Sequence, residues 1–254
     1  MKRNERIFCG EAFDGNDLLL KAVERLYLTT QHPEERIPWG WIARSLKGRA
    51  AWRPGVPGHH LLTAVPEESV TENDPEMLAG FVYGSFLPEY GGYLSYLGVD
   101  EHYRKRGVGT RLMTQMVKVL HAEAGGMDEP LPFVVWESKR PGVNAPAEDH
   151  CLWEARMKLF DRIGGCWIDG LELFTPNYGD DDDKPVVLQL FVKPVDRSRQ
   201  GFDPDFLRGI AAGLLARVYR LNADDPLVVR TIAQTRRPRL RPAGDSVRRP
   251  VGAA

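Results

Sequence analysis

The sequence has 254 residues, of which 43% are hydrophobic and 27% charged, and its formal net charge at pH 7 is -1. These fractions are those of a soluble globular protein and exclude a largely disordered chain, while the balanced charge gives no reason to expect nucleic acid as a partner. No apolar run reaches the roughly 18–20 residues of a membrane span, and the basic N-terminus lacks the apolar stretch of a signal peptide. Cys9, Cys151 and Cys166 lack metal-type spacing and indicate free thiols in a reducing, cytoplasmic setting.

The first half of the chain predicts helices followed by strands. Residues 15–48 read as helical, with Asn16 or Asp17 as the N-cap and a second helix around 33–46. An apolar period of two then predicts three strands, at 60–66, 79–87 and 93–99. A tight turn joins the last two as an antiparallel pair. After Arg104 the apolar period becomes helical, which predicts a long amphipathic helix over residues 108–124.

The second half of the chain is predicted to contain strands and helices, followed by a tail rich in arginine and proline. The expected elements are a buried strand, a helix, two strands and two further helices, at 131–137, 150–163, 166–174, 186–195, 206–221 and 226–232. Residues 236–250 contain six arginines and three prolines, which predicts a disordered basic tail. The element order predicts a mixed α/β protein with a central, mostly antiparallel sheet flanked by helices and a C-terminal helical extension. We expect a domain over residues 1–198, the helical extension over 199–235 and the tail over 236–254.

The most informative segment runs from strand to glycine-rich loop to helix, over residues 93–120. Gly107 and Gly109 remove side chains where the backbone must approach another group closely, at a helix start whose N–H groups lack partners. Such a terminus binds phosphate through these donors and the helix dipole. Arg104, Arg106 and the Thr110 hydroxyl add charge and a donor. The segment therefore predicts a pyrophosphate site.

Other phosphate-binding motifs do not fit this spacing. A Walker loop requires Lys after its last glycine, but Thr110 and Arg111 follow Gly109. A dinucleotide fingerprint requires a third glycine where Leu112 stands. The remaining alternative is a short G-x-G pattern that merely starts a helix.

The run from Arg104 to Gly109, RKRGVG, resembles the [QR]-x-x-G-x-[GA] signature with which the GNAT superfamily binds acyl-CoA. The strand that ends in Leu97-Gly98-Val99-Asp100 and the later helix RMKLFDRIG, residues 156–164, are also similar to that family. The resemblance implies acetyl-CoA as donor, with the pantetheine arm on the strand backbone and the pyrophosphate on the loop. The residues that it implies for cofactor binding are Leu97, Gly98, Val99, Arg104, Lys105, Arg106, Gly107, Val108, Gly109 and Thr110.

The implied reaction is direct attack of a primary amine on the acetyl thioester. An alkyl amine has a pKa near about 10, so a carboxylate or a water chain must take its proton. Glu137, at the end of the strand 131–137, is the candidate base; the alternatives are a solvated edge carboxylate or a structural ion pair. Many family members carry a tyrosine as general acid where this chain has Phe160. Tyr178 is the candidate that we select to replace it, with Tyr96 and Cys151 as alternatives.

Several other features favour structural interpretations. Glu89 and Glu101 lie in predicted turns as solvated charges, and Asp180–Asp183 suits a hairpin tip better than a calcium loop. His59, His60 and His150 lack a further ligand at suitable spacing, so no metal site is predicted. Trp41 is a candidate for the wall of the acceptor site, and the acidic segment 67–76 for its entrance.

The sequence thus predicts an N-acetyltransferase acting on a small-molecule or peptide amine, without a nucleic-acid or membrane partner. Two alternatives stay open: a non-catalytic acyl-CoA sensor, suggested by Phe160, and a scaffold whose C-terminal helix and arginine-rich tail recruit a partner. Two packings of the 206–221 helix stay open: on its own sheet, or on a second copy in a homodimer. The acceptor wall is built from loops that no motif fixes, so the acceptor is not predicted.

Overall fold

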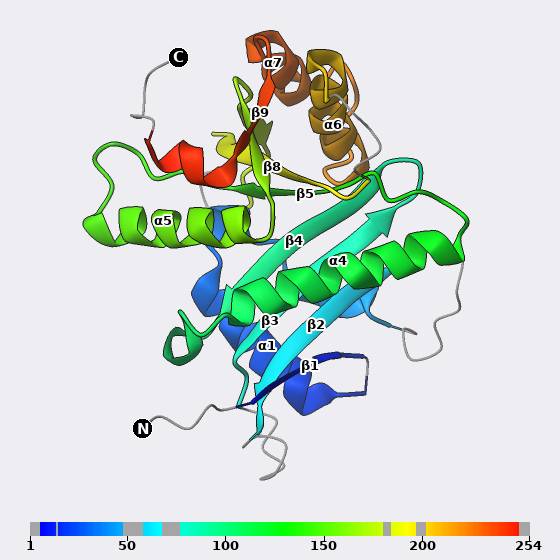
Figure 1. Cartoon of the computed structure of the whole chain (residues 1–254), viewed down its shortest axis with the longest axis vertical. Helices are drawn as coiled ribbons and strands as arrows, with labels where there is room; N and C mark the ends of the chain where they lie inside the picture. Colours follow the sequence, from blue (N-terminus) through cyan, green and yellow to red (C-terminus); the bar gives the residue numbers. More distant parts are fainter. Residues whose placement is uncertain are drawn as a thin grey trace. The chain divides into compact units, whose positions relative to one another are not determined.

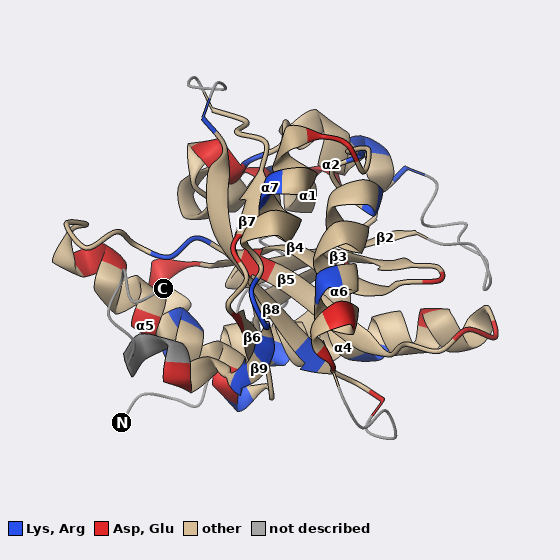
Figure 2. Cartoon of the chain, turned by 90° about the horizontal axis from the view of Figure 1, so that it is seen from above, with Lys and Arg blue, Asp and Glu red and all other residues tan. Residues whose placement is uncertain are grey.

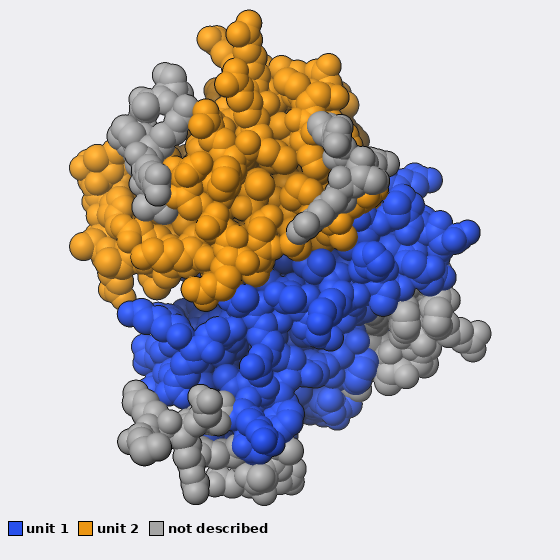
Figure 3. All heavy atoms as spheres, in the orientation of Figure 1, with its two compact units in different colours: residues 1–131 blue, residues 132–254 orange. Residues whose placement is uncertain are grey.

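The computed structural model describes residues 6–13, 15–47, 58–67, 77–179, 184–196 and 202–248. The chain forms two compact units, residues 1–131 and 132–254 (Figure 3). The boundary predicted near residue 198 falls inside the second unit, because the C-terminal helices belong to that unit and α7 packs against β7.

The first unit contains an antiparallel sheet in the order β1-β2-β3-β4. Its elements are β1 Ile7–Glu11, α1 Asp17–Thr30, the 3-10 turn η1 Pro33–Glu35, α2 Trp39–Ser45, β2 His59–Pro66, β3 Gly80–Leu87, β4 Gly91–Val99, the 3-10 turn η3 Glu101–Tyr103 and α4 Val108–Gly126. The predicted helices and strands are confirmed within a few residues, except that β1, an edge strand of five residues, was not predicted.

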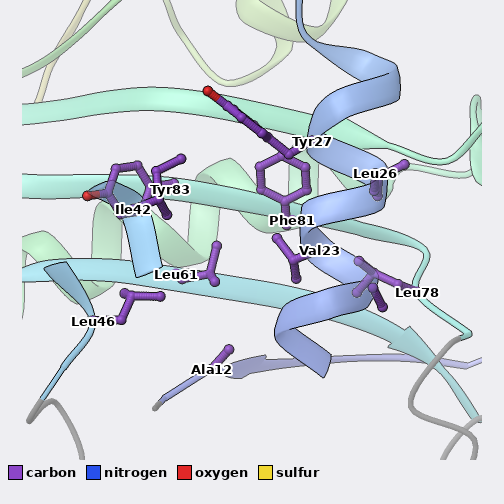
Figure 4. Packing of buried hydrophobic residues seen from close by; sticks show 11 residues of the cluster. Ala12, Val23, Leu26, Tyr27, Ile42, Leu46, Leu61, Leu78, Phe81 and Tyr83 are labelled. Carbon is purple, nitrogen blue, oxygen red and sulfur yellow. The ribbon is translucent and has the colours of Figure 1, made fainter. Parts of the chain in front are cut away.

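Helices α1 and α4 cover opposite faces of this sheet (Figure 1). Side chains alternate across a strand, so Leu61, Phe81 and Tyr83 join the cluster beneath α1 (Figure 4), whereas α4 buries Leu112 and Met116 completely. Each such side chain contributes about 1.5–3 kcal/mol on burial. The two layers fix the sheet that carries the predicted binding loop.

The face under α4 contains a buried histidine between two carboxylates. His60 Nδ1 lies 2.6 Å from Glu11 Oε1, and Nε2 lies 2.8 Å from Glu123 Oε2. His60 is 3% exposed and Glu123 is 1% exposed. Burial by itself lowers the pKa of His60, but the hydrogen bonds with Glu11 and Glu123 outweigh it and raise the pKa above its ordinary value of 6.5. The imidazole is therefore held as a cation that neutralises buried carboxylates.

Replacement of His60 by Ala should lower the free energy of unfolding by about 3–5 kcal/mol, because Glu123 loses the cation that faces it. A group whose folded pKa is raised stabilises fully below its unfolded pKa and loses that effect as pH rises through the folded pKa. The wild-type advantage over this variant, measured by urea unfolding, should therefore shrink as the pH is raised from 6.5 through the raised pKa of His60. An advantage that stays constant or grows over this range would contradict a cationic His60.

The second unit contains a further antiparallel set of strands in the order β5-β8-β6-β9, with β7 also paired to β8. Its elements are β5 Phe133–Ser138, α5 Ala147–Arg162, β6 Cys166–Asp169, β7 Leu173–Thr175, β8 Val186–Pro194, α6 Pro204–Arg217, α7 Pro226–Gln234, β9 Arg239–Pro242 and the 3-10 segment η4 Ala243–Arg248. Acidic and basic residues are interspersed along α5 and α6 (Figure 2). The predicted strand 166–174 is divided at Gly170, whose φ of +81° turns the backbone out of the strand conformation.

The prediction of a disordered tail is wrong for residues 239–248. Strand β9 pairs with β6, and Arg241 Nε lies 2.7 Å from Asp169 Oδ2. Ala243, which follows, is completely buried and donates its N–H to Gly165 O at 3.1 Å. Composition predicted disorder because arginine and proline provide no apolar period, whereas order here comes from pairing with a strand edge.

The predicted class is confirmed: a mixed α/β protein whose mostly antiparallel sheet is flanked by helices. In the part of the chain that the structure describes, no helix combines the length and the apolar character needed to cross a membrane.

Candidate functional site

The backbone of β4 presents hydrogen-bonding groups on the edge that faces away from β3. Asp100 donates its N–H to Ala79 O at 3.1 Å, and Val99 is registered opposite Gly80. In an antiparallel pair, hydrogen-bonded and non-hydrogen-bonded positions alternate. Val99 and Leu97 therefore occupy non-hydrogen-bonded positions, and their N–H and C=O groups point away from β3.

Two side chains reach these outward carbonyls. Gln31 Nε2 donates to Leu97 O at 3.0 Å, and Arg104 Nε donates to Val99 O at 3.4 Å. Both contacts are consistent with the orientation derived from the register. The predicted role of Leu97 and Val99 in binding a pantetheine arm remains a prediction, and the strand has the orientation that it requires.

Gly98, between these residues, is needed for packing. A Cβ at this position would lie 2.3 Å from Phe81 Cε1 and 2.7 Å from Thr30 Oγ1. Glycine therefore allows the end of α1 to approach β4 closely. The structure gives Gly98 a reason within the fold, independent of a bound cofactor.

The loop after β4 reverses the chain and delivers it to α4. Asp100 Oδ1 accepts a hydrogen bond from the N–H of His102 at 3.0 Å, which caps η3. Lys105 and Gly107 then adopt left-handed backbone conformations with φ of 62° and 81°. A Cβ at Gly107 would meet no protein atom within 4 Å, so the space in front of this glycine is open on the protein side. Gly107 is the N-cap of α4.

The N-terminus of α4 provides the donors of a candidate anion site. The first helical hydrogen bond runs from Arg111 N to Gly107 O at 3.0 Å, so the N–H groups of Val108, Gly109 and Thr110 precede any intrahelical acceptor. The side chains of Arg104, Lys105 and Arg106 are exposed beside these groups. Arg106 also lies over the ring of Tyr103, at 5.2 Å from the ring centroid. A helix N-terminus with adjacent cations attracts phosphate.

Arg111, the residue after Thr110, donates from its Nη1 to Ile7 O of β1. Its guanidinium therefore ties α4 to the edge of the sheet.

The candidate base lies in a polar cluster of the second unit. Glu137 is the penultimate residue of β5, and its Oε1 accepts a hydrogen bond of 2.8 Å from Tyr219 Oη. The same carboxylate also affects Tyr178. Burial, and then the negative charge of Glu137, raise the pKa of Tyr178 above 10.0. The structure thus joins Tyr219 to Glu137 by a hydrogen bond, and the charge of Glu137 influences Tyr178; the catalytic roles of Glu137 and Tyr178 remain predictions.

Sequence reasoning missed Tyr219 because nothing in its neighbourhood marks it. It follows α6, which was predicted to continue to residue 221 but ends at Arg217, and Arg220 has a left-handed φ of 59°. Only the path of the chain after α6 brings Tyr219 to Glu137.

Comparison with known proteins agrees with this geometry. The model of the acetyltransferase (GNAT) family matches residues 22–135. A protein from Bacteroides thetaiotaomicron assigned to the GNAT acetyltransferases has a similar fold, with a TM-score of 0.56, 17% identity and coverage of 85% of this chain and 99% of that chain. Residues 22–135 therefore match the GNAT acetyltransferase family, and the fold is that of GNAT acetyltransferases.

Two further solved structures share this fold at low identity. NAA60 from Arabidopsis thaliana in complex with acetyl-CoA has a TM-score of 0.52 and 19% identity, and covers 75% of this chain and 99% of its own. The NatC complex bound to Gag peptide and CoA gives a TM-score of 0.51 and 14% identity, again with 75% and 99% coverage. No protein with a curated function matches the sequence.

The GNAT match ends two residues before Glu137, so the candidate catalytic residues lie beyond it. Phe160, where the resemblance suggested a tyrosine, is 5% exposed and packs among aromatic rings, 5.2 Å from the centroid of Trp136 and 4.9 Å from that of Phe191. This position belongs to the core of the second unit. Two alternatives follow for the proposed reaction: another group supplies the proton, or the thiolate leaves without a general acid.

The alternative acids are less suitable than Tyr178. The Tyr96 hydroxyl donates to Glu35 O at 3.0 Å and accepts from the N–H of Ile37 at 3.2 Å, so it ties down the chain before α2. Cys151 is exposed on α5.

Other sequence candidates keep structural roles or lie outside the described residues. Trp41 is 54% exposed on α2, and its role at an acceptor site remains a prediction. Residues 68–76 of the acidic segment and Asp180–Asp183 lie outside the described residues. Within the described ranges, no three His, Cys, Asp or Glu side chains form a group that could hold a metal ion.

Proposed function

We propose that this GNAT protein is an N-acetyltransferase that moves an acetyl group from acetyl-CoA to a primary amine of a small molecule or peptide. The observation that carries the proposal is the continuous β4–α4 segment. It combines outward backbone groups at Leu97 and Val99 with the open N-terminus of α4. NAA60 was solved with acetyl-CoA and NatC with CoA and a peptide, and both have this fold.

The residues of the segment fit the parts of acyl-CoA. Backbone groups of Leu97 and Val99 are oriented to pair with the amide groups of a pantetheine arm, as an added strand pairs with a sheet edge. The N–H groups of Val108, Gly109 and Thr110, with Arg104 and Lys105 beside them, suit a pyrophosphate. The donor supplies the acetyl group as a thioester.

Glu137 and Tyr178 are proposed to handle the protons. The amine nitrogen forms a bond to the carbonyl carbon, the carbon–sulfur bond breaks, and Glu137 takes the proton that the amine loses, directly or through water. The raised pKa keeps Tyr178 protonated at neutral pH, so its hydroxyl can donate to the leaving sulfur. A backbone N–H near Val99 is proposed to polarise the carbonyl.

Phe160 is the observation that favours the alternative, a protein that binds acyl-CoA without turnover. The core position of this ring removes the hydroxyl that the resemblance suggested. Glu137, Tyr178 and Tyr219 supply a carboxylate and two phenols in the same unit, which favours the enzyme.

Turnover separates the two functions. We expect the purified chain to release CoA thiol from acetyl-CoA only when an amine is added, with small amines and N-terminal peptides as the panel. The acetylated amine should then appear in the mass spectrum. Binding of acetyl-CoA without release for any member of a broad panel would instead support the sensor.

A further inference from the structure

The segment after α6 reaches the candidate base from outside the predicted GNAT domain. Tyr219 belongs to the extension over residues 199–235, yet its hydroxyl donates to Glu137 Oε1 at 2.8 Å. Tyr219 and Glu137 are both half-buried, so this hydrogen bond is partly shielded from water.

Packing of α6 fixes the place of Tyr219. The buried side of the helix is formed by Leu207, Ile210, Ala211, Leu214 and Leu215. At its start, Phe206 packs edge-to-face on Phe133 of β5, with ring centroids 5.9 Å apart. Phe206 contacts the first residue of β5 and Tyr219 contacts the penultimate one, so α6 runs along this strand in the same direction.

The turn after α6 is also held by backbone bonds. Val218 donates to Leu214 O at 2.9 Å and Leu221 to Leu215 O at 3.2 Å, on either side of Tyr219. The backbone on both sides of Tyr219 is therefore held, so the hydrogen bond to Glu137 has only the side chain left to order.

A phenol that donates to a carboxylate favours the ionised form of that carboxylate and fixes its orientation. A base must be ionised to accept a proton, and it must point at the group that loses it. The negative charge of the same carboxylate also raises the pKa of Tyr178, in the loop after β7, but the hydrogen bond that orients Glu137 comes from Tyr219.

We propose that Tyr219 is a positioning residue for the reaction: it keeps Glu137 ionised and oriented, so a residue of the C-terminal extension takes part in catalysis. This inference rests on the proposed N-acetyltransferase function. It gives the extension a role in catalysis, in place of the alternative role of a scaffold that recruits partners.

The test uses the full chain with Tyr219→Phe, which removes the hydroxyl and keeps the ring. We expect kcat to fall about tenfold or more, the range for loss of a hydrogen bond to a charged group, with the KM for acetyl-CoA unchanged. The acid limb of the kcat/KM profile should move to higher pH, because a carboxylate without its donor protonates more readily. Tyr90→Phe, in the turn between β3 and β4, serves as the matched control and should leave both kcat and the profile unchanged.

A double variant distinguishes positioning from a general structural effect. In a Glu137→Gln background, Tyr219→Phe should lower kcat little further. The base that Tyr219 positions is already absent from that background. An active wild type with a Tyr219→Phe variant of unchanged kcat and unchanged acid limb would overturn the inference alone. A wild type that binds acetyl-CoA but acetylates no amine would overturn the proposed function and the inference with it.

Discussion

Replacement of Gly107 by Glu is expected to weaken acetyl-CoA binding by at least about a hundredfold, or about 2.7 kcal/mol. Gly107 caps α4, and a Cβ there would project into open space rather than into the protein. The added carboxylate would thus stand where the pyrophosphate is proposed to lie and would oppose its charge. Equilibrium dialysis with labelled acetyl-CoA measures the change directly.

The backbone effect of this substitution needs its own control. A side chain in the left-handed conformation costs about 1–2 kcal/mol, and Gly107 has a φ of +81°. Gly15 has a φ of +96° and no protein atom within 4 Å of its added Cβ, so Gly15→Glu imposes the same strain and charge before α1. This control should bind acetyl-CoA as the wild type does. Equal affinities of the Gly107→Glu and wild-type proteins would refute the pyrophosphate assignment.

Replacement of Glu137 by Gln should lower kcat by about 100-fold to 10000-fold, the contribution of a general base, while the affinity for acetyl-CoA stays unchanged. The amide keeps the size of the carboxylate and can still accept the hydrogen bond from Tyr219 Oη. The proton acceptor is lost, because an amide is not a base at neutral pH. Single-turnover measurement of amine acetylation isolates this step.

The matched control is Glu172→Gln, which removes an exposed carboxylate from the same unit. Its kcat should equal that of the wild type. If Glu137→Gln kept its kcat within about threefold, Glu137 would be excluded as the base and the proton would have to leave by another route.

The part of the site that the sequence predicts is the part built from consecutive residues. The strand, loop and helix around Gly107 follow from local periods and from glycine positions, and the structure places them as expected. Gly98 shows the limit of this reasoning. The resemblance implies a role for it in cofactor binding, but the close approach of Phe81 and Thr30 already requires a glycine there.

Features that depend on distant segments could not be predicted. The contact of Tyr219 with Glu137 joins residues 82 positions apart, and no local pattern marks either partner. Strand β9 has two arginines and a proline where a strand usually has β-branched residues, and it forms because β6 offers it an edge. The sequence marks His60 only as a histidine without metal-ligand spacing, whereas the fold places it between Glu11 and Glu123.

The central claim is that the β4–α4 segment binds acyl-CoA, and calorimetric titration of the wild-type chain with acetyl-CoA and with CoA tests it most directly. The account predicts saturable one-to-one binding of both, with a Kd in the micromolar range or tighter, about -8 kcal/mol. Absence of binding for both would contradict the account, and the GNAT domain would then have to serve as a scaffold without its cofactor.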